Sequence, residues 1–200
     1  DLTLSTALCL IYGTTFLFVP QLFRAFLATA AVTALLSIYL FQKRFHLGLF
    51  GLFFLSLRVI PSAQFYLGYP LRLLVGAFSA LLLRVMGFSV TREGVGLLWP
   101  GGRVMVDAPC SGIQMLWAGL LLVFTFACFF KLNNKTTLKL LCTSVGALVC
   151  GNVVRTTALS LVEMRSLAHI SWLHQLVGAL SYLITTLLIW CMATRLEQSQ

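Results

Sequence analysis

The sequence predicts an all-α polytopic integral membrane protein with about six transmembrane helices, an interfacial helix and a small extracytoplasmic β meander. Of its 200 residues, 60% are apolar and only 10% are charged. A chain this hydrophobic does not dissolve as a monomeric globule. Long uncharged runs, separated by short polar stretches, then mark the membrane segments. We expect one membrane domain, with N-terminal transmembrane helices over 1–69 and a core over 70–200.

The charge balance is strongly basic, with 14 Lys and Arg against five Asp and Glu and a net charge of +9. Such a balance can indicate nucleic-acid binding, but these basic residues do not form a run interleaved with exposed aromatic residues. Polytopic membrane proteins commonly carry excess Lys and Arg in their loops. The charge is therefore interpreted as membrane topology, and no nucleic-acid partner is expected.

Three apolar segments occupy the first 60 residues. The uncharged runs at 2–19 and 25–41 are joined by a short turn, which predicts a helical hairpin across the membrane. A compact basic loop follows at 42–46. Residues 47–60 form a third, shorter helix that ends at Pro61.

Residues 70–86 carry Arg72 and Arg84, with eleven uncharged residues between them. At about 1.5 Å per residue, this stretch is too short for a hydrocarbon layer of about 30 Å unless both arginines reach the interface. We therefore expect a helix that lies in the membrane interface. If the segment spans instead, the orientation of the first three helices reverses relative to the rest.

Short alternating segments replace the long apolar runs at 88–106. Turn residues at 93–94 and 100–102 break the pattern, and β-forming residues lie at 95–99 and 104–106. These signals predict a small β meander. Because unpaired backbone groups are not tolerated in lipid, the sheet should lie in water or under a protein cover, as a lid or a platform for a substrate.

The last three predicted spans are 111–130, 138–154 and 172–194, and the segment 156–171 is too polar to cross. Parity then places the residues before the first span, after the second and before the third at one membrane face. The lysine-rich loops at 42–46 and 131–139 are assigned to the cytoplasm by the positive-inside rule. Both termini are then inside, and the opposite face is extracytoplasmic.

Cys110, Arg155 and His174 stand at that extracytoplasmic face. Pro109 fits just inside a helix start, because its φ is set and it needs no amide partner, so Cys110 is expected in a first turn. The positive end of a helix favours a thiolate, which makes Cys110 the candidate nucleophile. The alternative is a small buried thiol at a helix end.

A thiol, an imidazole and a guanidinium are the groups that thiol acyl transfer needs. His174, at the start of the last helix, can take the thiol proton and later protonate the leaving amine. Arg155, at the end of the preceding helix, can stabilise an oxyanion with its forked donors. Asp107 could cap the Cys110 helix or orient His174. The residues expected to bind substrate or support the site are Asn152, Asp107, Gln114 and Ser111.

Other thiols and imidazoles have weaker assignments. Cys150, one turn from Arg155, is a rival nucleophile or a disulfide partner for Cys110. His169 is a second candidate base. No spacing typical of a zinc site occurs, so neither a metal nor a cofactor is expected. The cysteines interpreted as packing thiols inside apolar runs are Cys9, Cys128, Cys142 and Cys191.

Three ordered motifs resemble the signature of the exosortase/archaeosortase family, after a similar Gly-rich β-like stretch. The resemblance covers roughly residues 70–194, and fewer spans precede it than in the fuller members. The motifs are Ala108-Pro109-Cys110-Ser111-Gly112-Ile113, then Asn152-Val153-Val154-Arg155, then His174 with Gly178.

The resemblance implies a cysteine transpeptidase or protease of the cell membrane that cleaves exported proteins through a thioester acyl-enzyme. The implied substrate is a C-terminal sorting signal with a short motif, a hydrophobic helix and a basic tail, presented from the membrane lipid. It implies Cys110 as nucleophile, His174 as acid/base and Arg155 as transition-state stabiliser. Water, an amine or a lipid could accept the acyl group.

Two other classes of function stay open. A small transporter or anion-binding membrane protein would hold an anionic substrate at Arg155 while Cys110 only packs. A structural assembly subunit would explain the composition but not the three residues at one face. An enzyme should have one hyper-reactive thiol, whereas a carrier should keep transport after Cys110→Ala.

Overall fold

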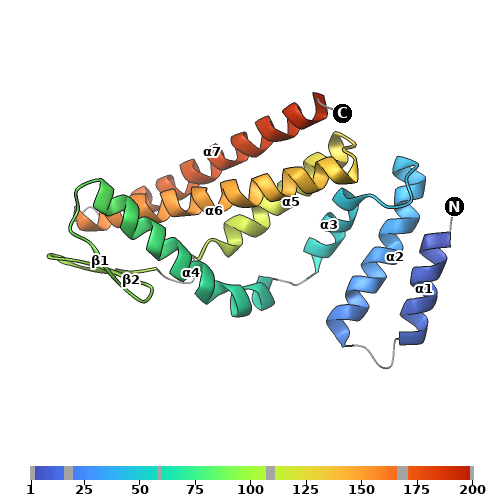
Figure 1. The fold of residues 1–200 in the computed structure, drawn as a ribbon, viewed down its shortest axis with the longest axis horizontal. Helices are drawn as coiled ribbons and strands as arrows, with labels where there is room; N and C mark the ends of the chain where they lie inside the picture. The colour runs from blue at the N-terminus through green and yellow to red at the C-terminus, as the bar shows by residue number, and fades with distance from the viewer. Residues whose placement is uncertain (1–2, 16–19, 58–59, 107–110, 166–170, 199–200) are drawn as a thin grey trace. The chain divides into compact units, whose positions relative to one another are not determined.

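A computed structural model describes residues 3–15, 20–57, 60–106, 111–165 and 171–198. These residues form seven α-helices and one three-stranded sheet, which Figure 1 shows in chain order from blue to red. The helices are α1 (Thr3–Thr15), α2 (Gln21–Phe41), α3 (Leu47–Ser56), α4 (Ile60–Val85), α5 (Ile113–Phe129), α6 (Asn134–Met164) and α7 (Ser171–Gln198).

The chain divides into two compact units. The first consists of Asp1–Val59, Leu120–Cys142 and Trp190–Gln200, and the second of Ile60–Gly119 and Thr143–Ile189. All three predicted signature motifs belong to the second unit. The predicted division at residues 69 and 70 stays a prediction.

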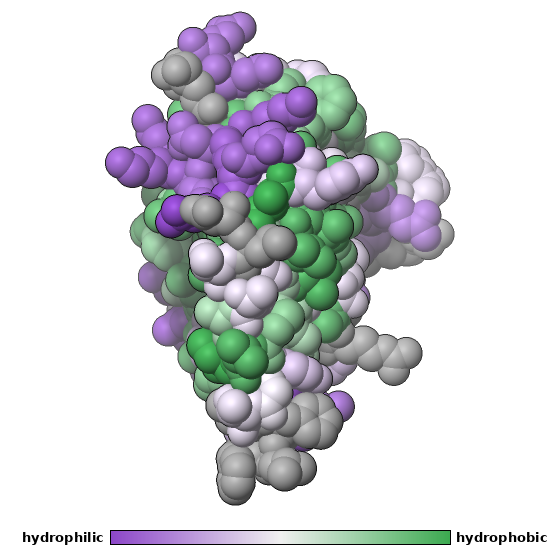
Figure 2. Space-filling model, turned by 90° about the vertical axis from the view of Figure 1, so that its right-hand side faces the viewer, coloured by the Kyte–Doolittle hydropathy of each residue, from purple (hydrophilic) through white to green (hydrophobic). Residues whose placement is uncertain are grey.

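Four described helices are long and apolar enough to cross a membrane. Large hydrophobic side chains on their surfaces are exposed, as expected where lipid replaces water as the solvent. Figure 2 shows hydrophobic side chains over part of the face it draws, beside groups of hydrophilic ones. These helices confirm the prediction of a helical membrane protein, but they do not confirm the count of six spans. The four segments are Phe23–Phe41, Ile60–Val85, Asn134–Met164 and Trp172–Gln198.

α4 differs from the predicted interfacial helix at 70–86. It is one helix of 26 residues that begins at Ile60 and contains Pro70. Pro61 falls in its first turn, where no amide hydrogen bond is needed, and the preceding helix α3 ends earlier than predicted, at Ser56. A length of about 39 Å exceeds the hydrocarbon layer of about 30 Å. α4 therefore qualifies as a span, and the orientation deduced from an interfacial helix loses its basis.

α6 continues beyond the predicted helix end at Arg155. It runs for 31 residues, from Asn134 to Met164, so Arg155 lies in a helix interior. The polar residues that follow do not break the helix, because their hydroxyls are satisfied within it. Thr157 and Ser160 each donate to the carbonyl four residues earlier, at 2.8 and 2.9 Å. The polar residues that follow Arg155 were therefore wrongly interpreted as a loop.

The predicted β meander is confirmed. Strands β1 (Thr91–Glu93), β2 (Gly96–Trp99) and β3 (Gly102–Met105) form an antiparallel sheet in the order β1-β2-β3. The glycine of the first turn, Gly94, has a φ of +59°, which suits a tight hairpin. The sheet covers a hydrophobic cluster between α4 and the last turn of α6. That cluster includes Leu83, Val90, Leu97, Leu161 and Met164.

His46, in the predicted basic loop, is fully buried in the first unit. It precedes α3 as its N-cap, and its Nδ1 accepts the amide of Leu49 at 3.3 Å. Its ring stacks on Phe41 with centroids 4.0 Å apart. Burial, with a smaller effect of Lys43, lowers the pKa of His46 below its usual value of 6.5. This imidazole is therefore part of the fold.

Candidate active site

The first and second signature motifs touch each other at Gly112 and Asn152. A Cβ built on Gly112 would lie 2.5 Å from the Nδ2 atom of Asn152. The φ of Gly112 is +80°, in the left-handed region. Both the contact and the backbone angle therefore require glycine. Asn152 is buried, so its amide is fixed against the chain that leads to Cys110.

The second and third motifs touch at Arg155 and Gly178. A Cβ on Gly178 would lie 3.6 Å from Nε and 3.8 Å from Nη2 of Arg155. Because Gly178 has no side chain, the Arg155 guanidinium lies beside the backbone of α7. The Nε atom of Arg155 is buried and has no hydrogen-bond partner among the described residues. A buried polar atom is normally paired, so a ligand or a reacting group could satisfy it.

His174 is exposed and stands one turn before Gly178 on α7, so the two share a helix face. It lines a cavity of about 230 Å³. The rest of the lining comes from the end of β3 and from α6, where Thr156 directly follows Arg155. Glu163 contributes a carboxylate to the same cavity. The imidazole therefore has access to solvent and to a space large enough for part of a ligand.

Cys110 and Asp107 lie outside the described residues, and so does His169. Their predicted roles stay predictions. α5 begins at Ile113 and not at Ser111, because Gly112 adopts a left-handed φ. The helix start predicted at 111 is therefore found at 113.

The supporting residues lie in different settings. Ser111 is buried, and its Oγ donates to Oε1 of Gln64 on α4 at 3.5 Å, a long hydrogen bond. Gln114 is exposed at the start of α5. Sequence reasoning missed Gln64, and it treated Glu163 only as a sign of polarity. A polar residue isolated among apolar neighbours was the available signal in both cases.

Cys150 is predicted as a rival nucleophile or a disulfide partner for Cys110, and the first of these roles stays a prediction. It is a free thiol. It lines a separate cavity of about 520 Å³ between α4 and α6, whose other lining residues are apolar, such as Phe78 and Val154. Within the described residues, no group of His, Cys, Asp and Glu could hold a metal ion.

The sequence also matches the model of a known protein family. The family model described as Transmembrane exosortase (Exosortase_EpsH) matches residues 2–191. The chain belongs to the transmembrane exosortase family. No curated protein and no solved structure matches it.

The match to the exosortase family model covers nearly the whole chain, including the N-terminal helices that precede the three motifs. The resemblance drawn from the motifs alone began near residue 70. Exosortase membership suggests a membrane transpeptidase, and the four long apolar helices fit a transmembrane protein.

Proposed function

We propose that this chain is a membrane cysteine transpeptidase that cleaves the C-terminal sorting signals of exported proteins. Cys110 is the nucleophile, His174 the general acid and base, and Arg155 the oxyanion stabiliser. The observation that carries this proposal is the pair of contacts at Gly112 and Gly178. Through these contacts, the first motif packs on Asn152 and the third motif on Arg155. These two residues of α6 are one turn apart.

The reaction proceeds through a thioester. The Cys110 sulfur bonds to the scissile carbonyl carbon while His174 takes the thiol proton. Collapse of the tetrahedral intermediate breaks the C–N bond, and His174 returns the proton to the leaving amine. Water, an amine or a lipid then attacks the thioester, releases the acyl group and restores the thiol.

The setting of Arg155 supports its role. Its guanidinium is partly buried, and the unpaired Nε leaves donor capacity for an oxygen that gains negative charge. Arginine stays protonated and offers planar, forked donors, which suit a fixed oxyanion site. Asn152 stands on the same face of α6 and holds Gly112, so it is proposed as a positioning residue.

The proposed location is the cell membrane, with the site on the extracytoplasmic face. Lys135 and Lys139 stand near the start of α6, and Arg155 is more than four turns further along the same helix than either of them. The lysine-rich end is assigned to the cytoplasm by the positive-inside rule. An impermeant thiol reagent applied to intact cells should then label Cys110.

The decisive test uses Cys110→Ala in cells and in liposomes. A C-terminal tail reporter should stay full-length with this variant and become shorter with the parent. Cys150→Ala is the matched control and should cleave normally, because its thiol faces the apolar cavity between α4 and α6. Normal processing by Cys110→Ala would remove the acyl-transfer proposal.

An anion-binding or transport function is the second candidate, and the unpaired Nε of Arg155 favours it. Such a protein needs a cation beside a cavity but no nucleophile. Transport or anion binding that survives Cys110→Ala and is lost in Arg155→Ala would support this function over proteolysis.

A further inference from the structure

β3 is an edge strand of the sheet in the described part of the chain. Its pairing with β2 fixes the direction of each backbone group. Val106 donates its amide to the carbonyl of Val95 at 3.0 Å. Because facing groups alternate along an antiparallel pair, Val104 also pairs with β2. The backbone N–H and C=O groups of Arg103 and Met105 therefore point away from the sheet.

The cavity that holds His174 lies along this outer edge. Val104, Met105 and Val106 all border it. Side chains alternate between the two faces of a strand, so a cavity bordered by three successive residues reaches the strand backbone. Opposite them stand Glu163 and His174. Within the described residues, the outer edge of β3 and the proposed acid/base thus border one space.

An exposed strand edge is a template for pairing with another extended chain, and proteins usually cover or blunt it. Several peptide-binding domains use such an edge: main-chain hydrogen bonds provide affinity, and adjacent pockets select side chains. The cavity of about 230 Å³ is below the range of about 300–1,000 Å³ typical of whole small-molecule sites. Its size suits a side chain of a bound peptide.

We propose that the outer edge of β3 binds the extended substrate segment beside the scissile bond as a fourth strand. Arg103 and Met105 supply the main-chain hydrogen bonds, and the His174 cavity receives a substrate side chain. This proposal rests on the proposed protease function and adds how that substrate is held. β3 leads through Val106 toward Cys110, which follows Met105 by only five residues.

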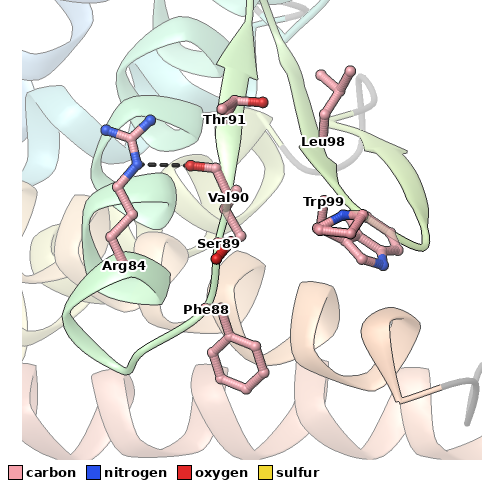
Figure 3. Close-up of a pocket in the computed structure, with 8 residues that line it drawn as sticks. Arg84, Phe88, Ser89, Val90, Thr91, Leu98 and Trp99 are labelled. Carbon is pink, nitrogen blue, oxygen red and sulfur yellow. Dashed lines mark hydrogen bonds between the residues drawn. The ribbon is translucent and has the colours of Figure 1, made fainter.

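The opposite edge of the sheet is tied to α4 instead. By the same alternation, Arg92 is the residue of β1 whose backbone faces outward. Its side chain crosses to the carbonyl of Leu73 on α4 at 3.2 Å. Figure 3 shows a second link on this side, where Nε of Arg84 donates to the carbonyl of Val90 at 2.7 Å. The β1 edge therefore serves as the control for substitutions in the β3 edge.

Met105→Pro is the test variant. Proline removes the outward N–H of Met105 but no bond to β2, and proline is tolerated on an edge whose amide faces outward. The probe is the C-terminal tail of an exported protein that is shortened by the parent and stays full-length with Cys110→Ala. We expect KM for this tail to rise at least about fivefold, from the lost hydrogen bond and the blocked edge, while kcat stays near the parental value.

Two controls isolate the backbone bond. Met105→Ala keeps the N–H and loses only the side chain, so its effect on KM should be smaller. Arg92→Pro makes the same backbone change on the opposite edge and also removes the side-chain bond to Leu73, yet it should leave KM within about twofold of the parent, less than the loss of one hydrogen bond. Thermal unfolding checks that the sheet is intact. If Met105→Pro unfolds, Arg103→Pro removes the other outward N–H.

The substrate backbone provides an independent test. A series of tail peptides, each with one amide replaced by an ester, loses one N–H at a time. In an added strand only alternate residues face β3, so weakened binding to Cys110→Ala should recur at every second position. Weakening without this period would overturn the proposal.

The outcomes separate this proposal from the protease function. If Met105→Pro and Arg103→Pro fold and cleave the tail with parental KM, the β3 proposal is wrong and the protease function stands. If no exported tail depends on Cys110 for shortening, the protease function fails and the β3 proposal fails with it.

Discussion

The first and second units each present a histidine, and the two imidazoles differ in almost every physical respect. His46 is fully buried, stacks on Phe41 and accepts the amide of Leu49 at the start of α3. His174 is exposed and lines a cavity with Glu163. Burial lowers the pKa of the His46 imidazole, whereas the His174 imidazole is open to solvent.

This difference shows why a histidine in a sequence is ambiguous. Both residues stand at the start of an apolar helix, so spacing alone does not separate them. The packing around the ring decides between a structural and a chemical role. The comparison therefore predicts opposite consequences for equivalent substitutions in the two units.

The largest expected effect is that of His174→Ala on turnover. Loss of a general acid and base slows the chemical step by about 100- to 10,000-fold. The unfolding temperature should not change, because the ring is exposed. Single-turnover cleavage of the tail reporter in liposomes and thermal unfolding in detergent measure the two properties. Cleavage at the parental rate would assign the base elsewhere, with His169 as the next candidate.

Arg155→Lys tests the guanidinium that lies beside Gly178, one turn along α7 from His174. A flexible ammonium does not reproduce the forked donors of a guanidinium, so turnover should fall by about 100- to 1,000-fold with substrate binding retained. Arg165→Lys, beyond the end of α6, is the matched control and should be silent. A rate for Arg155→Lys within about threefold of the parent, far short of the loss of one oxyanion donor, would reduce Arg155 to an interfacial anchor.

His46→Ala should act on stability and not on chemistry. It removes an N-cap acceptor, which typically costs about 0.5–2 kcal/mol, and leaves a void beside Phe41. We expect the free energy of unfolding in detergent to fall by at least about 1 kcal/mol. Cleavage per folded molecule should stay unchanged. A selective loss of cleavage would contradict the division of roles between the two histidines.

The smallest expected effect is a dependence of stability on pH. Because the folded-state pKa of His46 lies below 6.5, the unfolded chain binds more protons as the pH falls through 6.5. The contribution of His46 is therefore complete above that pH and decreases below it. His46→Asn keeps a capping side chain without a titrating ring and should flatten this slope. An unchanged slope between pH 5 and 7 would assign the effect to other groups.

Local signals predicted part of this structure from the sequence. The β meander follows from turn residues such as Gly94 and from short runs of β-forming residues, which act over a few positions. The bounds of α4 and α6 were missed because proline residues were treated as helix boundaries and the segment after Arg155 was treated as too polar to cross. Pro61 fits the first turn of α4, and Thr157 satisfies its hydroxyl within α6.

The candidate site was predicted as a set of residues but not as an arrangement. Motif order indicated Cys110, Arg155 and His174, yet nothing local shows that Gly112 packs on Asn152, forty residues away. Such contacts depend on how helices cross. Glu163 was missed as a cavity residue for the same reason, since its partners come from β3 and α7.

The continuity of α6 constrains how this chain can change in length. Arg155 and the sheet-packing residues Leu161 and Met164 belong to one helix with no glycine or proline between them. One inserted or deleted residue between Arg155 and Leu161 would rotate them relative to each other by about 100°. Substitutions on the outer face of α6 between Arg155 and Leu161 do not change the angle between these two residues around the helix axis. Related chains should therefore vary here in composition and hardly at all in residue number.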